Sequence, residues 1–108
     1  MTEQEFKEAV EMLRSQDSMT YEDGFQWLIG HADNFLEPLT NLMRNELNPD
    51  YRAKLIEVLG HCTTEKVIPT LAAELSSKHR DVRFWAHSQL EHFESPAANE
   101  IANRYKAE

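Results

Sequence analysis

The stretch DYRAKLIEVLGH at residues 50–61 recurs 31 positions later as DVRFWAHSQLEH at residues 81–92. The two copies share the Asp, the Arg and the final His, and Leu55 and Leu59 stand at the places of Ala86 and Leu90. A third copy, TYEDGFQWLIGH, precedes them at residues 20–31. A period near 30 residues with helical spacing of apolar positions is typical of stacked helical repeats. The sequence therefore predicts an all-α fold, a short α-solenoid of stacked helical repeats.

The residues that recur resemble those of the HEAT repeat, and the short period resembles its phycobilin-lyase-type variant. The residues that carry the resemblance are Pro69, Leu71, Leu75, Asp81, Val82, Arg83, Ala86, Leu90 and Phe93. The resemblance covers residues 20–105, although the first copy has Thr20 and Glu22 where the Asp and Arg belong. It implies that each repeat is a pair of antiparallel helices.

The resemblance also implies a structural role for the repeated Asp and Arg. In HEAT repeats these residues link neighbouring repeats, so Asp50, Arg52, Asp81 and Arg83 are expected to form an inter-repeat ladder. Charge pairs in such a network contribute more to the stability of the fold than isolated surface pairs do. We therefore assign them to architecture and not to binding.

The chain is short enough to be one domain, which at this length buries about 65% of its unfolded surface. We expect residues 1–16 to form an N-terminal capping helix, followed by repeats at about 20–48, 49–78 and 79–108. Expected helix-capping residues are Thr2 with Glu5, Thr20, Asp33 or Asn34, Asn48 with Pro49, Thr63 or Thr64, and Ser95 with Pro96. The helix from Asp50 to Gly60 is expected to supply the centre of the core.

The charge is uneven along the chain. Residues 1–50 contain 11 acidic and 3 basic residues, a net charge of −8, whereas residues 51–108 contain 8 of each. A negative field attracts basic proteins and repels nucleic acid, and it acts mainly on the association rate. We therefore expect a basic protein partner and no nucleic-acid binding. The alternative is that the acidic residues only keep a small domain soluble.

Several features favour a cytoplasmic protein without membrane association. No apolar run approaches the roughly 20 residues that a membrane span requires. The first residues are acidic and lack the basic-then-apolar order of a secretory signal. Cys62 is the single cysteine, so no disulfide forms within the chain.

Metal binding and catalysis are not expected. His31, His61 and His92 share one repeat position at a helix C-terminal end, where a positive charge is favoured. Packed helices about 10 Å apart would separate them too far to share an ion. Cys62 follows His61 directly, and adjacent helical residues do not face each other, so Cys62 is expected to be a small buried residue. The sequence predicts no cofactor and no enzyme activity.

Two tryptophans depart from the repeat pattern. Trp27 aligns with Glu57 and Ser88, and Trp85 aligns with Lys54. Each tryptophan either packs into the domain, Trp27 beneath the N-terminal helix and Trp85 against the C-terminal helix, or forms an exposed anchor for a partner.

These features together predict a monomeric, non-catalytic protein-binding module. The second helices of the repeats should line a concave face and display Glu37, Asn41, Arg44, Asn45, Thr70, Ala73, Glu74 and Ser77. The candidate partner-binding residues are Glu22, Asp23, Trp27, Asp33, Glu37, Asn41, Arg44 and Trp85.

The most specific hypothesis is an immunity protein that neutralises a bacterial toxin such as a basic nuclease, by analogy of size and charge. The first alternative is a HEAT-like adaptor or scaffold domain of a larger assembly. The second is a component of a bilin-type lyase or a small-molecule chaperone, which would need an apolar cleft that the sequence does not indicate.

Overall fold

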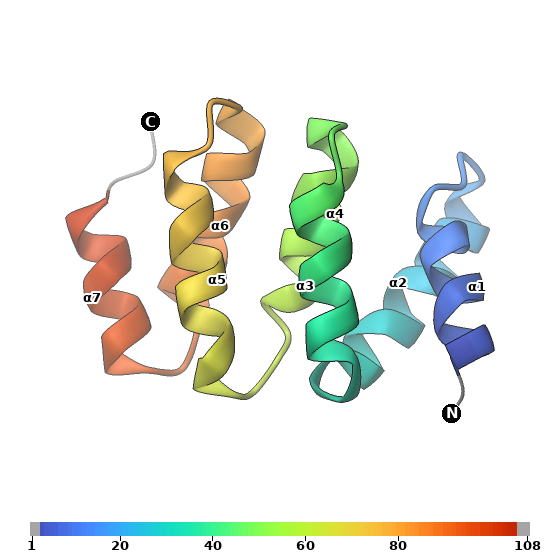
Figure 1. Cartoon of the computed structure of the whole chain (residues 1–108), viewed down its shortest axis with the longest axis horizontal. Helices are drawn as coiled ribbons and strands as arrows, with labels where there is room; N and C mark the ends of the chain where they lie inside the picture. Colours follow the sequence, from blue (N-terminus) through green and yellow to red (C-terminus); the bar gives the residue numbers. More distant parts are fainter. Residues whose placement is uncertain (1–2, 106–108) are drawn as a thin grey trace.

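The computed structural model describes residues 3–105, which form α-helices and short 3-10 turns without a strand (Figure 1). The helices are α1 (Glu3–Leu13), α2 (Ser18–His31), α3 (Leu36–Asn45), α4 (Pro49–Leu59), α5 (Ile68–Ala73), α6 (Arg80–His92) and α7 (Pro96–Arg104). The turns are η1 (Ala32–Phe35), η2 (Glu65–Val67) and η3 (Glu74–Ser76). The all-α prediction is confirmed.

The helices lie side by side along the longest axis of the molecule, with α1 at one end and α7 at the other (Figure 1). The described part of the chain measures 38 × 25 × 23 Å. Helices α2, α4 and α6 pack in series, while α3 packs on α4, and α5 and α7 pack on α6. This order is a short HEAT-like solenoid, as predicted. The division into three repeats at the stated boundaries stays a prediction.

Helix α2 begins earlier than the sequence suggested. Its N-cap is Asp17, whose carboxylate accepts hydrogen bonds from the backbone N–H of Thr20 at 3.0 Å and from the Thr20 hydroxyl at 2.7 Å. Thr20 therefore lies in the first turn and is not the cap. An Asp three residues ahead of a free N–H is the stronger acceptor, which explains the difference. The expected capping box at Thr2 lies outside the described residues.

At three other helix or turn starts the predicted capping residue occupies the N-cap position, but only two of these residues make a cap hydrogen bond. The Asn48 side chain accepts from the N–H of Asp50 at 2.9 Å, and Pro49 takes the first helical position, as predicted. Thr64 caps the turn η2 that leads into α5. Ser95 stands at the N-cap of α7, but its hydroxyl donates to the Glu65 carboxylate and makes no cap hydrogen bond.

The second helices of the first two predicted repeats are shorter than expected because each follows a 3-10 turn. Turn η1 precedes α3, and neither Asp33 nor Asn34 caps that helix; its N-cap position is Phe35, which makes no side-chain cap bond. A proline stands in the first turn of each helix, Pro38 in α3 and Pro69 in α5. There a missing N–H costs no helical hydrogen bond.

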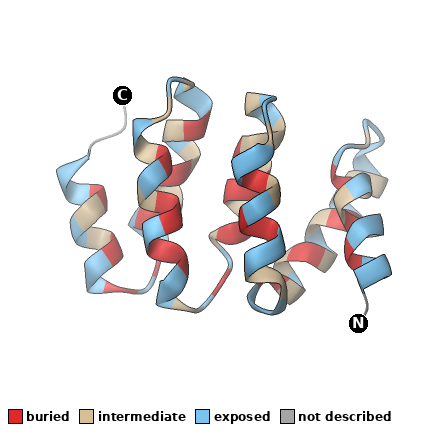
Figure 2. Cartoon of the chain, viewed as in Figure 1, coloured by how far each residue is buried: buried red, intermediate tan, exposed pale blue. Residues whose placement is uncertain are grey.

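The core runs through the middle of the stack, between the helices (Figure 2). In α4 the four predicted core residues Leu55, Ile56, Val58 and Leu59 are buried, and Leu59 is fully enclosed. Burial of such side chains contributes roughly 1.5–3 kcal/mol each. None of the helices within residues 3–105 combines the length and apolar character needed to cross a membrane.

Helix α1 packs closely on α2 through a glycine. A Cβ atom on Gly24 would lie 2.6 Å from the Met12 Cβ and 2.8 Å from the Ala9 carbonyl oxygen, so only glycine permits this approach. On α1 the residues Phe6, Ala9 and Leu13 are buried. The N-terminal helix therefore covers the apolar side of α2, as an end helix of a solenoid should.

Candidate functional site

Helices α1, α2 and α3, here called the acidic helices, carry seven exposed acidic residues. The exposed acidic residues on them are Glu3, Glu5, Glu8, Glu11, Glu22, Asp23 and Glu37. Among the predicted partner-binding residues, Glu22 and Asp23 lie on α2 and Glu37 lies on α3. The structure thus presents these carboxylates to solvent, where they can act on an approaching charge.

Asp33 has a different position from the other predicted acids. Its carboxylate accepts from the Thr63 backbone N–H and from the Thr63 hydroxyl, both at 2.8 Å. The hydrogen bonds from Thr63 hold the pKa of Asp33 below its ordinary value. Asp33 joins the turn after α2 to the turn after α4, so its first role is structural.

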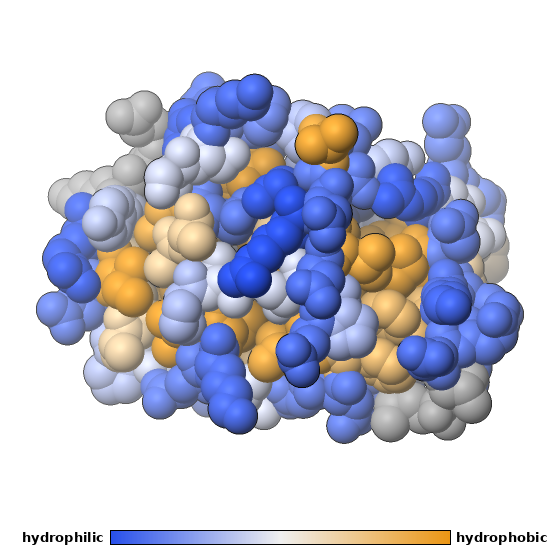
Figure 3. All heavy atoms as spheres, in the orientation of Figure 1, coloured by the Kyte–Doolittle hydropathy of each residue, from blue (hydrophilic) through white to orange (hydrophobic). Residues whose placement is uncertain are grey.

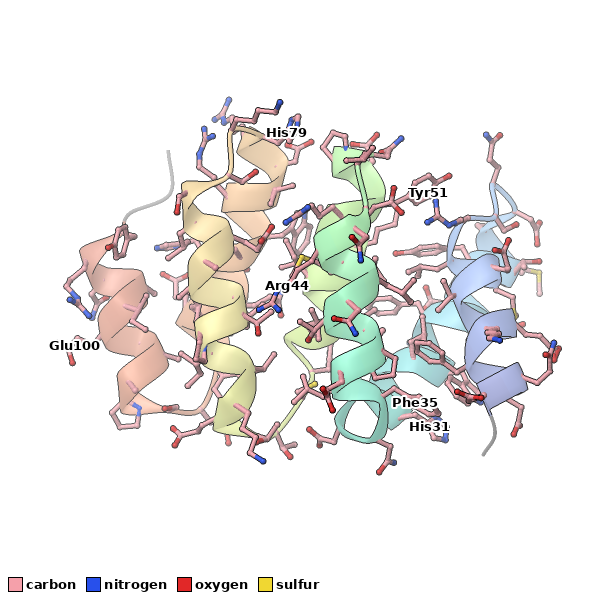
Figure 4. The ribbon with its side chains drawn as sticks, in the orientation of Figure 1. His31, Phe35, Arg44, Tyr51, His79 and Glu100 are labelled. Carbon is pink, nitrogen blue, oxygen red and sulfur yellow. The ribbon has the colours of Figure 1, made fainter. Side chains whose placement is uncertain are left out.

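Trp27 is half-buried and packs within an aromatic group. Its ring stacks on His31 with centroids 4.1 Å apart, and it meets Phe35 at 5.7 Å. Phe35 in turn stacks on Phe6 of α1 at 4.6 Å, and Figure 4 shows His31 and Phe35 close together beside that helix. Through Phe35, Trp27 belongs to the contact between α1 and the rest of the stack.

The predicted concave face is formed only in part. Glu37, Asn41, Arg44 and Asn45 are exposed on α3, and Arg44 projects from the middle of the stack (Figure 4). On the next pair of elements, Ala73 is exposed and Ser77 is half-buried, but Thr70 and Glu74 are buried. The expectation that Thr70 and Glu74 are displayed to a partner is therefore wrong. Glu74 is buried because it pairs with an arginine of α4.

That arginine is Arg52. Its Nε and Nη2 atoms donate to the two carboxylate oxygens of Glu74 at 2.7 and 2.9 Å. Its Nη1 donates to the carbonyl oxygens of Arg44 and Glu46 at 3.2 and 3.3 Å. Arg83, one repeat later, donates to the Ser77 carbonyl at 2.8 Å. Each repeated arginine thus bonds the carbonyl six residues before it and closes the loop ahead of its own helix.

The repeated aspartates do not pair with these arginines, which corrects the predicted ladder. Asp50 and Asp81 are exposed in the first turns of α4 and α6, where a carboxylate is favoured by the positive end of the helix dipole. The Arg52 guanidinium instead pairs with Glu74, whose two carboxylate oxygens accept from its Nε and Nη2 atoms. Among the described residues, the Asp side chains therefore face solvent between the helices.

Asp50 and Asp81 both line a surface hollow of about 330 Å³, here called the α4–α6 hollow. Its lining residues are Asp50, Ala53, Lys54, Glu57, Asp81 and Trp85. Trp85 is half-buried and contacts Phe84 edge to face, with centroids 5.5 Å apart. The Lys54 ammonium lies 4.3 Å from the centre of the Tyr21 ring on α2. Burial raises the pKa of Glu57.

A second hollow of about 370 Å³ lies where the α3–α4 loop meets the residues before α6. Its lining includes the paired Arg52 and Glu74, together with Leu47, Lys78 and His79. Leu47 is 90% exposed, the largest exposed fraction of any large apolar side chain described. Figure 3 shows that hydrophilic residues cover most of the visible face, with apolar patches between the helices.

The repeated histidines are held by local contacts. His31 Nδ1 lies 2.7 Å from the Trp27 carbonyl oxygen, and His92 Nδ1 lies 2.8 Å from that of Ser88. His61 meets the Phe25 ring edge to face at 6.1 Å. Within residues 3–105, no three His, Cys, Asp or Glu side chains are grouped so that they could hold a metal ion.

Cys62 is buried at the end of α4, as predicted. Burial, together with the nearby Asp33 carboxylate, raises the pKa of its thiol to about 12. A thiol with that pKa is protonated near neutral pH and is a poor nucleophile.

The structure divides the predicted partner-binding residues between two regions. Glu22, Asp23 and Glu37 belong to the acidic helices, whereas Trp85 lies in the α4–α6 hollow. Sequence reasoning missed Glu57 and the two aspartates as neighbours of Trp85. A signal was present: Asp50 and Asp81 occupy one repeat position, and Lys54 and Trp85 occupy another.

A family model described as HEAT repeats matches residues 36–103. No characterised protein and no solved structure matched the chain. HEAT repeats commonly mediate protein–protein interactions, and the family is generally non-catalytic. The match covers more than half of the chain and spans α3 to α7, the part in which the repeated Arg closes each loop. The chain belongs to the HEAT-repeat family.

Proposed function

We propose that this domain is a non-catalytic module that binds a basic protein, and that the acidic helices guide the partner's approach. The observation that carries the proposal is the exposed negative charge of α1 to α3. Residues 3–50 contain 11 acidic and 3 basic residues, whereas residues 51–105 contain 7 of each. A field of one sign concentrated at one end of a molecule orients and accelerates an oppositely charged partner.

The contacts within this region support the same proposal. Glu22 accepts a hydrogen bond from Gln26 on its own helix at 2.9 Å and stays exposed. Glu8 on α1 and Glu37 on α3 are likewise exposed. Asp17 and Asp33, by contrast, are used in capping and in joining two turns. The carboxylates of Glu8, Glu22 and Glu37 are therefore exposed and can interact with a partner.

The most specific form of this proposal is an immunity protein that neutralises a bacterial toxin, and the charge favours a basic nuclease as that toxin. The proposal includes a cytoplasmic protein that acts as a monomer, without metal or cofactor. A second candidate is an adaptor or scaffold domain of a larger assembly, which the HEAT-repeat family favours. The hollows described above are lined largely by charged and polar residues, which favours a protein partner over a bilin or another apolar small molecule.

The proposal is tested by affinity capture from the source organism with three forms of the immobilised domain. The first is the wild type. The second carries Glu8→Gln, Glu22→Gln and Glu37→Gln on the acidic helices. The third is a matched control with Glu91→Gln, Glu94→Gln and Glu100→Gln, which removes the same charge from the other end of the stack, where Glu100 points outward (Figure 4).

We expect a basic protein to be retained by the wild type and by the control, and to be lost or reduced with the first triple variant. If that protein is a nuclease whose toxicity is relieved by co-expression of this chain, the immunity form of the proposal is supported. Retention of only acidic or neutral proteins, equally by all three forms, would contradict the proposal.

A further inference from the structure

We propose that the α4–α6 hollow is an anchoring site for an arginine or lysine side chain of the basic partner, held against Trp85 and among the carboxylates of Asp50 and Asp81. This inference rests on the proposed function and adds where the partner is held after its approach.

The first support is the shape of the site. Two neighbouring helices of the series, α4 and α6, form its walls, and their packing against each other fixes the distance between them. Its volume of about 330 Å³ suits one or two side chains and not a whole peptide segment. Side-chain pockets of this kind between rigid elements are where interface hot spots form.

The second support is the aromatic pair at the α6 wall. Trp85 packs partly against the core, and the exposed Phe84 ring, 49% accessible, meets it at an interplanar angle of 90°. The indole is therefore supported from behind and from its neighbour, and little side-chain entropy is lost on binding. A cation near the face of a tryptophan is favoured by the ring quadrupole, more so when water is excluded.

The third support is charge complementarity. Asp50, Asp81 and Glu57 bring three carboxyl groups to the lining, against a single ammonium, that of Lys54. That ammonium is already placed over the Tyr21 ring on α2, 4.3 Å from its centre. The half-buried Glu57 has a raised pKa because burial disfavours its charge, so an arriving cation would favour the ionised form. A guanidinium can also donate to two carboxylates at once.

The test uses a hexaarginine peptide as the probe and a hexacitrulline peptide as its neutral counterpart of nearly the same shape. Each is titrated into the full ¹⁵N-labelled chain, and the indole N–H signals of Trp27 and Trp85 are followed together with the backbone amides. We expect hexaarginine to shift the Trp85 indole and the amides around Asp50 and Asp81, and hexacitrulline to leave them unchanged.

Two variants and a control define the site. The double variant Asp50→Asn with Asp81→Asn keeps side-chain shape at two exposed positions, and we expect it to weaken hexaarginine binding at the hollow about tenfold. Trp85→Leu is expected to weaken it about fivefold. The control, Glu91→Gln with Glu100→Gln, removes two charges elsewhere and should leave the affinity within about twofold. Circular dichroism and thermal denaturation verify that each variant is folded.

Four results would overturn the inference, and they separate it from the proposed function. Shifts confined to α1 to α3, with Trp85 unchanged, would refute the anchoring site while leaving a basic partner for the acidic helices. Equal shifts with hexacitrulline, or wild-type affinity in the Asp50 and Asp81 double variant, would also refute the site. Absence of any hexaarginine binding would refute both the site and the basic partner.

Discussion

At the scale of single residues, the hydrogen bonds of Asp33 with Thr63 carry a share of the stability that depends on pH. Because these bonds lower the pKa of Asp33 in the folded chain, the stabilisation is present above its ordinary value of 3.8 and is lost as the pH falls through the lowered value. Asp33→Ala should therefore reduce the unfolding free energy by about 1 kcal/mol at pH 7. The difference from wild type should shrink at pH 3.

Urea denaturation at both pH values measures this difference, with Asp23→Ala as a control because the Asp23 carboxylate is exposed on α2. A loss in Asp33→Ala that is equally large at pH 7 and pH 3 would show that the carboxylate charge is not involved.

The buried thiol of Cys62 gives a second prediction at this scale. With only 3% of the residue exposed and a pKa of about 12, it should react with iodoacetamide at pH 8 far more slowly in the folded protein than in denaturant. Mass spectrometry after timed quenching gives both rates. Equal rates would mean that the end of α4 opens readily and that Cys62 is not part of the core.

Some residues whose hydrogen-bond partners are close in sequence were predictable, whereas residues with distant partners were not. The Asn48 cap acts on residues two and three positions ahead, so the pattern Asn-Pro was sufficient. Thr63 bonds Asp33 and Ser95 bonds Glu65, each across 30 residues. Asp33, Thr63 and Ser95 were each interpreted as helix caps, and their contacts one repeat period away arise only from the packing of neighbouring repeats.

At the scale of helices, α4 is the centre of the stack and Leu59 is its most informative residue. Its side chain is fully buried, so Leu59→Ala should leave a cavity and reduce the unfolding free energy by about 2–5 kcal/mol. Leu47→Ala is the matched control, because Leu47 is 90% exposed and should change stability by less than about 0.5 kcal/mol. Urea denaturation compares the two; similar losses would show that the register of α4 is misassigned.

The contact of α1 with α2 gives a prediction based on two glycines of the same helix. Gly24→Ala places a methyl group 2.6 Å from the Met12 Cβ and should force the helices apart, lowering the melting temperature. Gly30→Ala meets nothing within 4 Å and should stabilise α2 by up to about 1 kcal/mol through helix propensity. Thermal denaturation of the two variants tests this prediction. A change of the melting temperature in the same direction in both variants would contradict the described packing.

Helix type and order were predictable from apolar spacing, but helix length was not. Asp33 or Asn34, and Thr63 or Thr64, were expected to begin helices, yet the 3-10 turns η1 and η2 form at these places. Such turns depend on how the neighbouring helices pack, and the local sequence pattern carries little information about that packing. The burial of Glu74 could not be predicted either, because it follows from the reach of Arg52 on another helix.

At the scale of the whole molecule, the solenoid converts a charge difference along the sequence into a charge difference along its axis. The acidic helices lie toward the N-terminal end and α7 lies at the other (Figure 1). The repeat period predicted this arrangement, since stacked repeats keep sequence order in space. The α4–α6 hollow was missed, because the repeat positions of Asp50 and Trp85 were not combined with the packing of two repeats that brings both residues to its lining.

The central claim, that the acidic helices guide a basic protein, predicts a characteristic dependence of association on salt. Charge steering acts on the association rate and is screened at distances near 8 Å at physiological ionic strength. A variant without the steering charge should associate slowly at low salt and respond weakly to added salt, while its dissociation rate changes little.

The direct measurement is stopped-flow association of the captured basic partner with the wild type and with the variant Glu8→Gln, Glu22→Gln and Glu37→Gln, from 20 mM to 500 mM NaCl. We expect the wild-type rate constant to be about tenfold or more above that of the variant at low salt and to converge with it at high salt. The variant with Glu91→Gln, Glu94→Gln and Glu100→Gln should remain close to wild type. Equal rate constants for wild type and the first variant at every salt concentration would contradict the claim.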